Sequence, residues 1–412
     1  MSGSVVVSQL GARMHYAVPR IFASQDRLAH FYTDICATDG WPRMVNLLPP
    51  ALLPASVKRL TGRVPKGVAP ELTSTFPGFG IRSALRRLKH TTINQQNAHG
   101  VWAGSTFSRL VASRGFHDAA GLYAFSGDAL EQMRAAKQQG MWTAVEQMIA
   151  PRDVVEELLV GEQKSFPHWA ASHADDPFVD AFANRERAEW ALADIIVCPS
   201  EFVRRNVVER GGRAERCVVV PYGIDPKFPP AGGMRAQGPL RVLTVGEVGR
   251  RKGSPYIVEA ARSLGRSAEF RMAGPTNLSA DVKAELSRHV ALRGIVPRAE
   301  MAREYAWADV FLLPSICEGS ATAIYEALGA GLPVICTENA GSVVRNGIDG
   351  FIVPIRDSEA IARALSTFIA NPGLRLAMAE SAVERAAEFT VKRYGERLLE
   401  ALSPLPARRR LP

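Results

Sequence analysis

The sequence has little of what membrane-spanning, zinc-binding and disulfide-rich proteins need. No apolar run approaches the ~18 residues that a transmembrane helix requires, and Val5–Val7 is too short for the apolar core of a signal peptide. The five cysteines include no Cys-x-x-Cys pair, and their odd number argues against a disulfide framework or a zinc site. These absences predict a cytoplasmic protein with reduced thiols.

Acidic residues are almost missing from residues 58–89, which hold eight Lys and Arg side chains and Glu71, in a chain of net charge +9. Ile81, Leu85 and Leu88 share one face of a predicted helix, with basic side chains around them. Such a helix suits an anionic membrane surface, and a packed helix with a solvated basic side is the alternative. Nucleic acid is not an expected partner, because no RNA-binding aromatic motif or zinc finger accompanies the charge.

The length and the order of apolar runs predict an α/β protein with two domains. A chain of 412 residues is too long for one ordinary core. Short apolar runs alternate with helix-like stretches, as in stacked βα units with parallel sheets. Residues 226–239, rich in proline and glycine, form the expected linker, and residues 44–80 carry no clear pattern. The expected strands are 5–9, 122–126, 142–147, 195–198, 217–221, 241–246, 269–274, 290–295, 310–314, 333–337 and 350–354.

Two glutamates eight positions apart are the most informative feature. Glu318 follows a short apolar run that reads as a buried strand, and Glu326 lies in an Ala- and Leu-rich stretch that reads as a helix. The two carboxylates are then separated by roughly 12 Å along the axis. The backbone N–H groups of residues 319–322 point into the gap between them, where they suit a phosphate. A nucleotide sugar, with hydroxyls on both sides of a pyrophosphate, matches this layout.

Further motifs occur in order around this pair. They are Cys198-Pro-Ser-Glu-Phe-Val203, Val218-Val-Val-Pro-Tyr-Gly-Ile-Asp225, Val245-Gly-Glu-Val-Gly-Arg-Arg-Lys-Gly253 and the stretch 337–354. Together with Glu318 and Glu326, they resemble family 4 of the retaining, GT-B type glycosyltransferases, closely over residues 195–400 and loosely before. The resemblance implies two Rossmann-like domains with a donor cleft between them. These would be residues 1–225 on the acceptor side, the linker 226–239, residues 240–390 for the nucleotide sugar, and a crossover helix with a basic tail at 391–412.

The resemblance also implies roles for single residues. Glu318 would contact the hydroxyls of the donor sugar, and Glu326 would contact those of the ribose. Lys252 would neutralise the pyrophosphate and stabilise the leaving group. Glu247 stands where the family usually has an arginine, so Arg250 or Arg251 is expected to supply the second positive charge. The remaining donor-binding candidates are Gly246, Gly319, Ser320, Ala321, Thr322 and, at the base, Val296.

The first half offers weaker candidates. Gly11 follows the first expected strand and lets the backbone approach a ligand, with Arg13 and His15 as contacts to donor or acceptor. Many family members carry a histidine where a later strand of this half ends in Glu146. Glu146 could act as a general base or acceptor contact, with a pKa raised by burial, or it could be a satisfied polar strand end.

The resemblance implies a retaining transferase of the hexosyltransferase type, and basic residues beside a helix N-terminus that can hold phosphates favour a metal-independent reaction. It would move a sugar from a nucleotide-diphosphate donor, its substrate rather than a cofactor, to a hydroxyl of a glycan or lipid-linked acceptor. It would act in polysaccharide, lipid-linked glycan or glycoconjugate synthesis, in the cytoplasm or at the inner face of the cell membrane. Two alternatives are a GT-B nucleotide-sugar 2-epimerase, which needs no acceptor, and a non-catalytic binding or scaffold protein, which Glu247 and the missing histidine favour.

Overall fold

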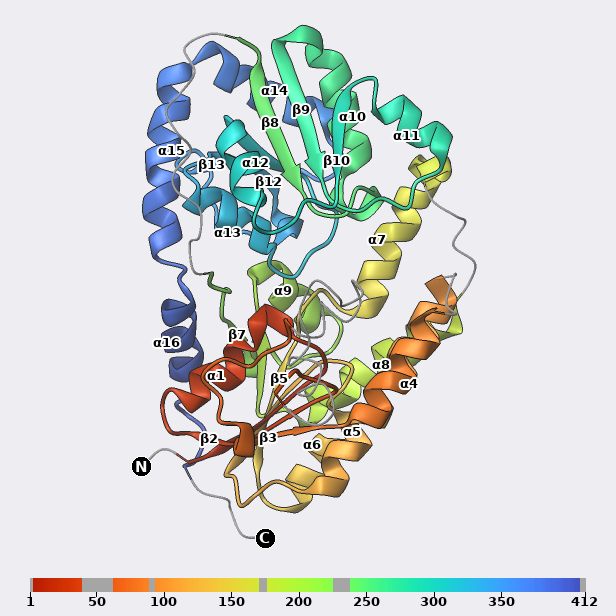
Figure 1. Cartoon of the computed structure of the whole chain (residues 1–412), viewed down its shortest axis with the longest axis vertical. Helices are drawn as coiled ribbons and strands as arrows, with labels where there is room; N and C mark the ends of the chain where they lie inside the picture. The colour runs from red at the N-terminus through yellow and green to blue at the C-terminus, as the bar shows by residue number, and fades with distance from the viewer. Residues whose placement is uncertain (1–2, 39–61, 89–92, 170–175, 225–237, 408–412) are drawn as a thin grey trace, which may run out of the picture.

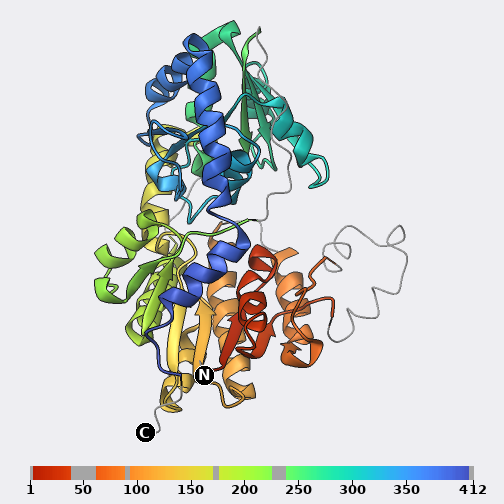
Figure 2. The same ribbon diagram turned by 90° about the vertical axis from the view of Figure 1, so that its left-hand side faces the viewer.

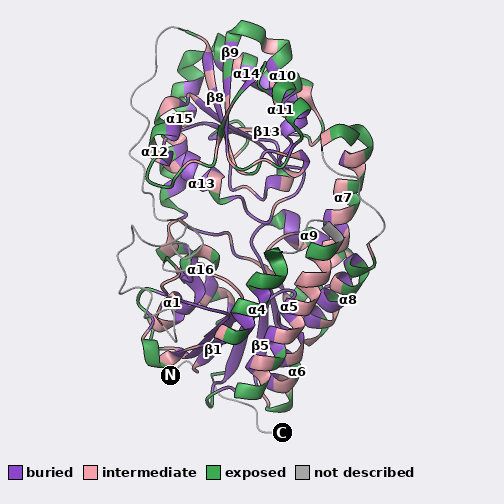
Figure 3. Ribbon diagram, turned by 45° about the vertical axis from the view of Figure 1, so that its right-hand side comes forward, coloured by how far each residue is buried: buried purple, intermediate pink, exposed green. Residues whose placement is uncertain are grey.

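The chain forms two parallel β-sheets flanked by helices, one stacked above the other in Figure 1. Both sheets are buried, and the outer faces of many of the surrounding helices are exposed (Figure 3). The linker predicted at 226–239 lies almost entirely outside the described residues, as do both ends of the basic segment 58–89. The computed structural model describes residues 3–38, 62–88, 93–169, 176–224 and 238–407.

The first domain holds seven parallel strands in the order β3-β2-β1-β4-β5-β6-β7. Strands β1, β4 and β5 are buried along their whole length, because helices cover both faces of the sheet. The strands are β1 (Val5–Gln9), β2 (Leu28–Thr33), β3 (Thr73–Thr75), β4 (Gly121–Phe125), β5 (Trp142–Glu146), β6 (Ile195–Cys198) and β7 (Cys217–Val219).

Helices in this domain begin at recognisable caps. The side chain of Asp176 accepts a hydrogen bond from the N–H of Phe178, and that of Ser200 accepts one from the N–H of Val203. The α-helices are α1 (Ala17–Ala23), α4 (Pro77–Leu88), α5 (Ile93–Arg114), α6 (Leu130–Gln138), α7 (Arg152–Ser165), α8 (Pro177–Leu192) and α9 (Glu201–Glu209). The short 3-10 turns are η1 (Arg13–His15), η3 (Pro70–Leu72), η4 (Pro167–Trp169) and η5 (Ala214–Arg216).

The second domain holds six parallel strands in the order β10-β9-β8-β11-β12-β13. They are β8 (Leu240–Val245), β9 (Ala268–Ala273), β10 (Val290–Gly294), β11 (Val310–Leu313), β12 (Val334–Thr337) and β13 (Gly350–Val353). Its helices are η6 (Arg250–Lys252), α10 (Ser254–Leu264), η7 (Gly265–Ser267), α11 (Ala280–Leu286), α12 (Met301–Trp307), α13 (Thr322–Gly329), η8 (Glu338–Ala340), α14 (Ser358–Ala370) and α15 (Pro372–Ala387).

All eleven strands expected from the sequence are present within a residue or two of their predicted bounds, but β2 and β3 were missed. Strand β2 is buried although it carries polar side chains, and the ring of His30 bonds the hydroxyl of Ser74 at 2.8 Å. These polar residues interrupt the apolar run that marks a buried strand. Strand β3, with three residues, is too short to leave a periodic pattern.

Both sheets share one topology, which positions the site. In each, the first strand lies between the second and the fourth, so the order reverses between β1 and β4 and between β8 and β11. Open α/β sheets bind ligands outside the carboxyl ends of their strands at such reversals. The loops to inspect are therefore those after β1 and β4 in the first domain and those after β8 and β11 in the second.

The end of the chain returns to the first domain. Helix α15 packs on α13, and after a cap at Thr390 the chain continues into α16 (Val391–Ala401), which packs on α1 (Figure 2). The ring of Tyr394 meets that of Tyr222 edge-on, with centroids 5.8 Å apart. A side chain at Gly223 would collide with the carbonyl of Thr390, because an added Cβ would lie 2.2 Å from its oxygen. This is the crossover that the resemblance implied.

Helix α7 makes a further link between the domains. It starts beside β5 in the first domain and rises along the right side of Figure 1 until its last turns contact η6 in the second. Across the described residues, no helix combines the length and apolar character needed to cross a membrane.

Candidate functional site

The loop after β8 brings cations to the cleft. Gly246, directly after the strand, has φ of +136°, a conformation that favours glycine, and an added Cβ would lie 3.0 Å from Cε of Lys252. The glycine therefore leaves room for the lysine side chain. Lys252 lies at the end of η6 and is buried. Burial lowers the pKa of its ammonium, and the nearby carboxylate of Glu318 opposes that shift.

The loop after β11 supplies Glu318. Its Oε1 accepts hydrogen bonds from Nζ of Lys252, at 2.9 Å, and from the guanidinium of Arg251. The structure thus brings together three of the predicted site residues, one carboxylate and two cations, at the reversal between β8 and β11. A phosphate entering here would compete with Glu318 for both cations.

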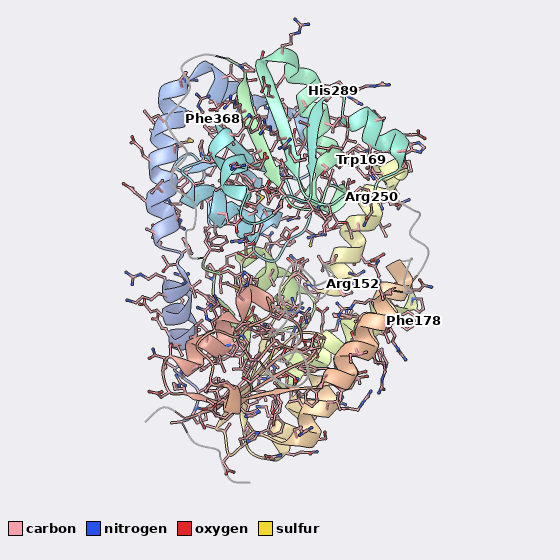
Figure 4. All side chains as sticks on the ribbon, viewed as in Figure 1. Arg152, Trp169, Phe178, Arg250, His289 and Phe368 are labelled. Atoms are coloured by element: carbon pink, nitrogen blue, oxygen red, sulfur yellow. The ribbon has the colours of Figure 1, made fainter. Side chains whose placement is uncertain are left out.

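Arg250 is turned away from this cluster. Its guanidinium donates to the side-chain oxygen of Gln163 on α7, and the residue is buried. Figure 4 shows it where α7 meets the second domain, whereas Arg152 lies at the other end of that helix. Of the two arginines expected to replace the usual one, Arg251 is therefore the one that reaches the cleft. Glu247 is exposed.

Glu326 lies one loop further on, inside α13. Its Oε2 accepts a bond from the hydroxyl of Tyr305 at 2.8 Å, and its Oε1 pairs with Arg298 at 2.7 Å. Arg298 is more than half exposed, whereas Tyr305 is fully buried and fixes the carboxylate. Glu326, Arg298 and Thr322 line a hollow of about 540 Å³ that residues of the first domain, among them Met14, complete.

The backbone between the two glutamates is only partly available. The N–H of Ala321 already donates to the carbonyl of Ala340, so it is not one of the free groups expected at the helix start. Gly319 touches the first domain, since an added Cβ would lie 1.8 Å from the carbonyl oxygen of Met148. The hydroxyl of Ser320 bonds that of Tyr325 at 2.6 Å. Glu318, Gly319 and Ser320 line a second hollow, of about 430 Å³, opposite Ser126 and Arg152.

Glu146 does not reach the cleft. Its carboxylate accepts bonds from the hydroxyls of Tyr123 at 2.6 Å, Tyr222 at 2.7 Å and Tyr394 at 3.5 Å. Burial raises its pKa, and the tyrosine bonds oppose that shift. Both oxygens are engaged, so the structure supports the alternative that it is a satisfied strand end, which ties α16 to the first domain.

Two further predicted residues lie apart from the cations. The N–H of Gly11 donates to the carboxylate of Asp34 at 3.1 Å, so this glycine lies in the first domain's own loop cluster. Val296 is half-buried beyond the end of β10 and packs against the core that includes α13. It lies on the same loop as Arg298, on the side of the cleft that holds Glu326.

Sequence reasoning missed several residues that shape the site. Arg298 and Tyr305 hold Glu326, and Asp128 lies after β4 with almost no exposure. The only sequence signal for Asp128 was a Ser-Gly-Asp run after an expected strand. Glu162 on α7 was also missed. It is fully buried and accepts bonds from the hydroxyl of Tyr256 at 3.0 Å and from Nε of Arg356 at 2.6 Å.

No cluster of three or more His, Cys, Asp or Glu side chains in the described parts is arranged to hold a metal ion. The cations that contact Glu318 and Glu326 are Lys252, Arg251 and Arg298.

Comparisons with known proteins agree with this layout. Residues 239–371 match the family model "Glycosyl transferases group 1". The chain is 31% identical over 193 residues to the amylovoran biosynthesis glycosyltransferase AmsK of Erwinia amylovora. The aligned region covers 43% of this chain and 47% of that protein. The chain is also 29% identical over 244 residues to a D-inositol 3-phosphate glycosyltransferase of Corynebacterium urealyticum, covering 52% and 57%. The chain thus spans about half the length of the curated relatives it matches.

Solved structures cover nearly the whole chain. HepE of Anabaena, in complex with UDP, superposes with a TM-score of 0.60 at 15% identity, over 98% of this chain and 100% of that one. Sucrose-phosphate synthase from Thermosynechococcus elongatus gives 0.64 at 17%, over 98% and 99%. The predicted GT-B fold, with two Rossmann-like domains, is confirmed.

Proposed function

We propose that this protein is a retaining glycosyltransferase that moves a hexose from a nucleoside diphosphate sugar to an acceptor hydroxyl in glycan synthesis. The observation that carries the proposal is the convergence of Lys252 and Arg251 on Glu318 at the reversal between β8 and β11. The match of residues 239–371 to a glycosyltransferase family and the polysaccharide role in the name of AmsK support it.

The contacts suggest how the donor binds. The pyrophosphate takes over Lys252 and Arg251, and this exchange frees the oxygens of Glu318 for the hydroxyls of the sugar. The ribose displaces the exposed Arg298 and bonds Glu326, which Tyr305 keeps in place. These cations supply the charge that a metal ion supplies in other transferases, so the proposed reaction is metal-independent.

The reaction breaks the bond between the anomeric carbon and the diphosphate oxygen and forms one to the acceptor oxygen. As negative charge builds on the diphosphate, Lys252 and Arg251 stabilise it. The acceptor proton passes to an oxygen of the departing phosphate on the same face, which gives retention without a protein base. Glu146, held by three tyrosines, then needs no catalytic role.

Thermal stabilisation of the purified protein by UDP, GDP and ADP tests the donor site. A nucleotide at 100 times its dissociation constant adds about 2.7 kcal/mol of stability. We expect one of the three nucleotides to raise Tm, and we expect this shift to disappear in Lys252→Ala and Glu326→Ala. Lys392→Ala and Glu359→Ala, at side chains that are 87% exposed, serve as matched controls. No shift with any nucleotide would overturn the proposal, and labelled sugar recovered as an epimer without an acceptor would favour the epimerase.

We also propose that the enzyme works on the cytoplasmic face of an anionic membrane. Ile81, Leu85 and Leu88 of α4 are 43%, 57% and 82% exposed, and the arginines among them are exposed too. Apolar side chains that point outward between cations suit a surface of acidic lipid headgroups.

Co-sedimentation with vesicles tests this surface. We expect binding to vesicles of phosphatidylglycerol and phosphatidylcholine and little binding to phosphatidylcholine alone. The double variant Leu85→Ser/Leu88→Ser should bind several-fold less, while Leu374→Ser/Leu376→Ser, on the exposed face of α15, should bind like the parent. Equal binding by both double variants would refute the role of α4.

A further inference from the structure

A separate hollow of about 250 Å³ lies in the first domain, at the reversal between β1 and β4. We call it the N-domain pocket. It is built by the loop after β1, the loop after β4 and the facing sides of α4 and α5. Its polar lining comes mainly from Arg13, Asp34, Arg63, Arg87, His99 and Asp128.

Asp128 marks this pocket as a ligand site. The residue is 4% exposed, and Oδ1 of its carboxyl group has no hydrogen-bond partner in the part of the chain that the structure describes. A buried acceptor left unpaired is unfavourable, and native proteins keep few of them. Burial raises its pKa to about 8, against the charge of Arg13, so the carboxyl group is mostly protonated at neutral pH. It can then both donate to and accept from a ligand hydroxyl.

The arginines set the charge of the pocket. Arg63 pairs with one oxygen of Asp34 at 3.1 Å, and the other oxygen accepts a hydrogen bond from the N–H of Gly11. Both oxygens of the Asp34 carboxylate therefore have partners. Arg13 and Arg87 are exposed and make no ion pair within the described residues. Two positive charges in the pocket are therefore left without an ion-pair partner among the described side chains. An anionic group on the ligand would compensate them.

The pocket is continuous with the cleft. Arg13, Gly100, Ser126 and Phe182 line both the N-domain pocket and the neighbouring hollow that contains Glu318 and Gly319. A ligand anchored against Asp128 and Arg87 can therefore extend past Arg13 to the point where a donor sugar would contact Glu318.

We propose that the N-domain pocket is the acceptor site and that it selects a saccharide carrying an anionic group, a carboxylate or a phosphate. This inference rests on the proposed transferase function. Arg87 and Arg13 hold the anion, and Asp128 bonds a hydroxyl of the same saccharide.

A glycan-binding assay on the full chain, with and without UDP, tests it. The probes are immobilised oligosaccharides ending in glucuronate, oligosaccharides ending in a sugar phosphate, and the carboxyl-reduced and dephosphorylated counterparts of both. We expect binding to acidic probes to be about tenfold or more tighter than to neutral ones. Arg87→Ala should remove that preference, whereas Arg82→Ala, also exposed on α4 but outside the pocket, should keep it. Asp128→Ala should weaken binding without changing the thermal shift with UDP.

The outcomes separate the two proposals. Stronger binding to the glucuronate or to the phosphate probes identifies the source of the anion. Equal binding to acidic and neutral probes, equal behaviour of Arg87→Ala and Arg82→Ala, or no binding at millimolar probe would overturn the acceptor assignment. A UDP shift that depends on Lys252 would leave the transferase proposal standing in that case. Acidic glycan binding without any nucleotide shift would instead overturn the transferase reaction.

Discussion

The two sheets share a strand order but differ in how they treat the carboxylates at their reversals. In the second domain, Glu318 pairs with Lys252 and Arg251, and Glu326 pairs with Arg298. In the first domain, Asp128 keeps a carboxyl oxygen that none of the described residues satisfies. The proposed donor site is thus held together by its own charges, whereas the proposed acceptor pocket retains a carboxyl oxygen without a partner among the described residues.

Under the proposed function, this difference shows how one fold can bind two kinds of substrate. A nucleotide diphosphate brings the same charges to every reaction, so its site can be built from internal ion pairs that the phosphates replace. Acceptors vary in shape, and a pocket assembled from loops and helix faces varies with them. The cleft between the domains joins both at Arg13 and Ser126.

The largest effect is expected from Lys252→Ala. Removing a preorganised cation that faces developing charge should lower kcat by about 100- to 1,000-fold. Arg250→Ala, two positions earlier in η6 but directed at Gln163, should lower kcat far less. Transfer of radiolabelled sugar to acceptor, measured for both variants, checks the contrast. Similar losses of kcat in the two variants would contradict the distinction between Lys252, which faces the cleft, and Arg250, which bonds α7.

Glu326→Ala comes next. The residue contributes binding rather than charge stabilisation, so the affinity for the nucleoside diphosphate should fall by about 10- to 100-fold, as for loss of charged hydrogen bonds. The kcat at saturating donor should change little, because ribose contacts are the same in the ground and transition states. Calorimetric titration with the nucleotide, beside Glu359→Ala as control, measures this. A loss confined to kcat would contradict the assigned role.

Much of the second domain could be predicted from sequence because its site residues lie close together along the chain. Gly246, Lys252 and Arg251 share one loop, and Glu318 and Glu326 share one strand-turn-helix unit. The first domain is different, since Glu146 meets tyrosines from residues 123, 222 and 394. No local sequence pattern indicates that both carboxylate oxygens of Glu146 already accept hydrogen bonds.

Asp128 could not be predicted for the same reason. Its surroundings come from loops and helices that the topology brings together, including α4, whose first residues lie in a stretch without a readable pattern. Strand β2 was missed because the buried side chain of His30 interrupts its apolar run. Contacts between segments that are far apart in the sequence determine the surroundings of such residues, and the periodicity of a single sequence does not reveal these contacts.

Glu162→Gln tests whether the contact of α7 with the second domain positions η6 and its cations. Glutamine keeps the shape but weakens the bonds to Tyr256 and Arg356, so the free energy of unfolding should fall by about 1–3 kcal/mol. Glu157→Gln, at a side chain on α7 that is 62% exposed, is the control. Chemical denaturation measures both. If the glutamine variant also raises KM for the donor without changing kcat, α7 positions η6; an unchanged KM would limit Glu162 to stability.

The smallest effect, and the sharpest test of the contrast, is the pH dependence of Asp128→Asn. The folded-state pKa is raised from the ordinary 3.8 to about 8, mainly by burial, with Glu189 adding to the shift and Arg13 and Arg185 opposing it. The folded protein therefore holds a proton that the unfolded chain releases between about pH 4 and pH 8, and the parent loses stability as pH rises through that window. Asparagine removes this loss, so the free energy of unfolding of the variant should rise relative to that of the parent by about 1 kcal/mol by pH 8. The gain is smaller than the full pKa shift implies, because the folded protein relaxes around the buried charge. Burial also raises the pKa of Glu186, which is present in both proteins and cancels in the comparison. Glu189 is present in both as well, and its repulsion of the Asp128 carboxylate is part of the loss that the variant removes. Urea unfolding at pH 5 and pH 8 measures the difference. A variant that is less stable than the parent at both pH values would mean that Asp128 is satisfied in the folded state and that the first domain holds its carboxylates as the second does.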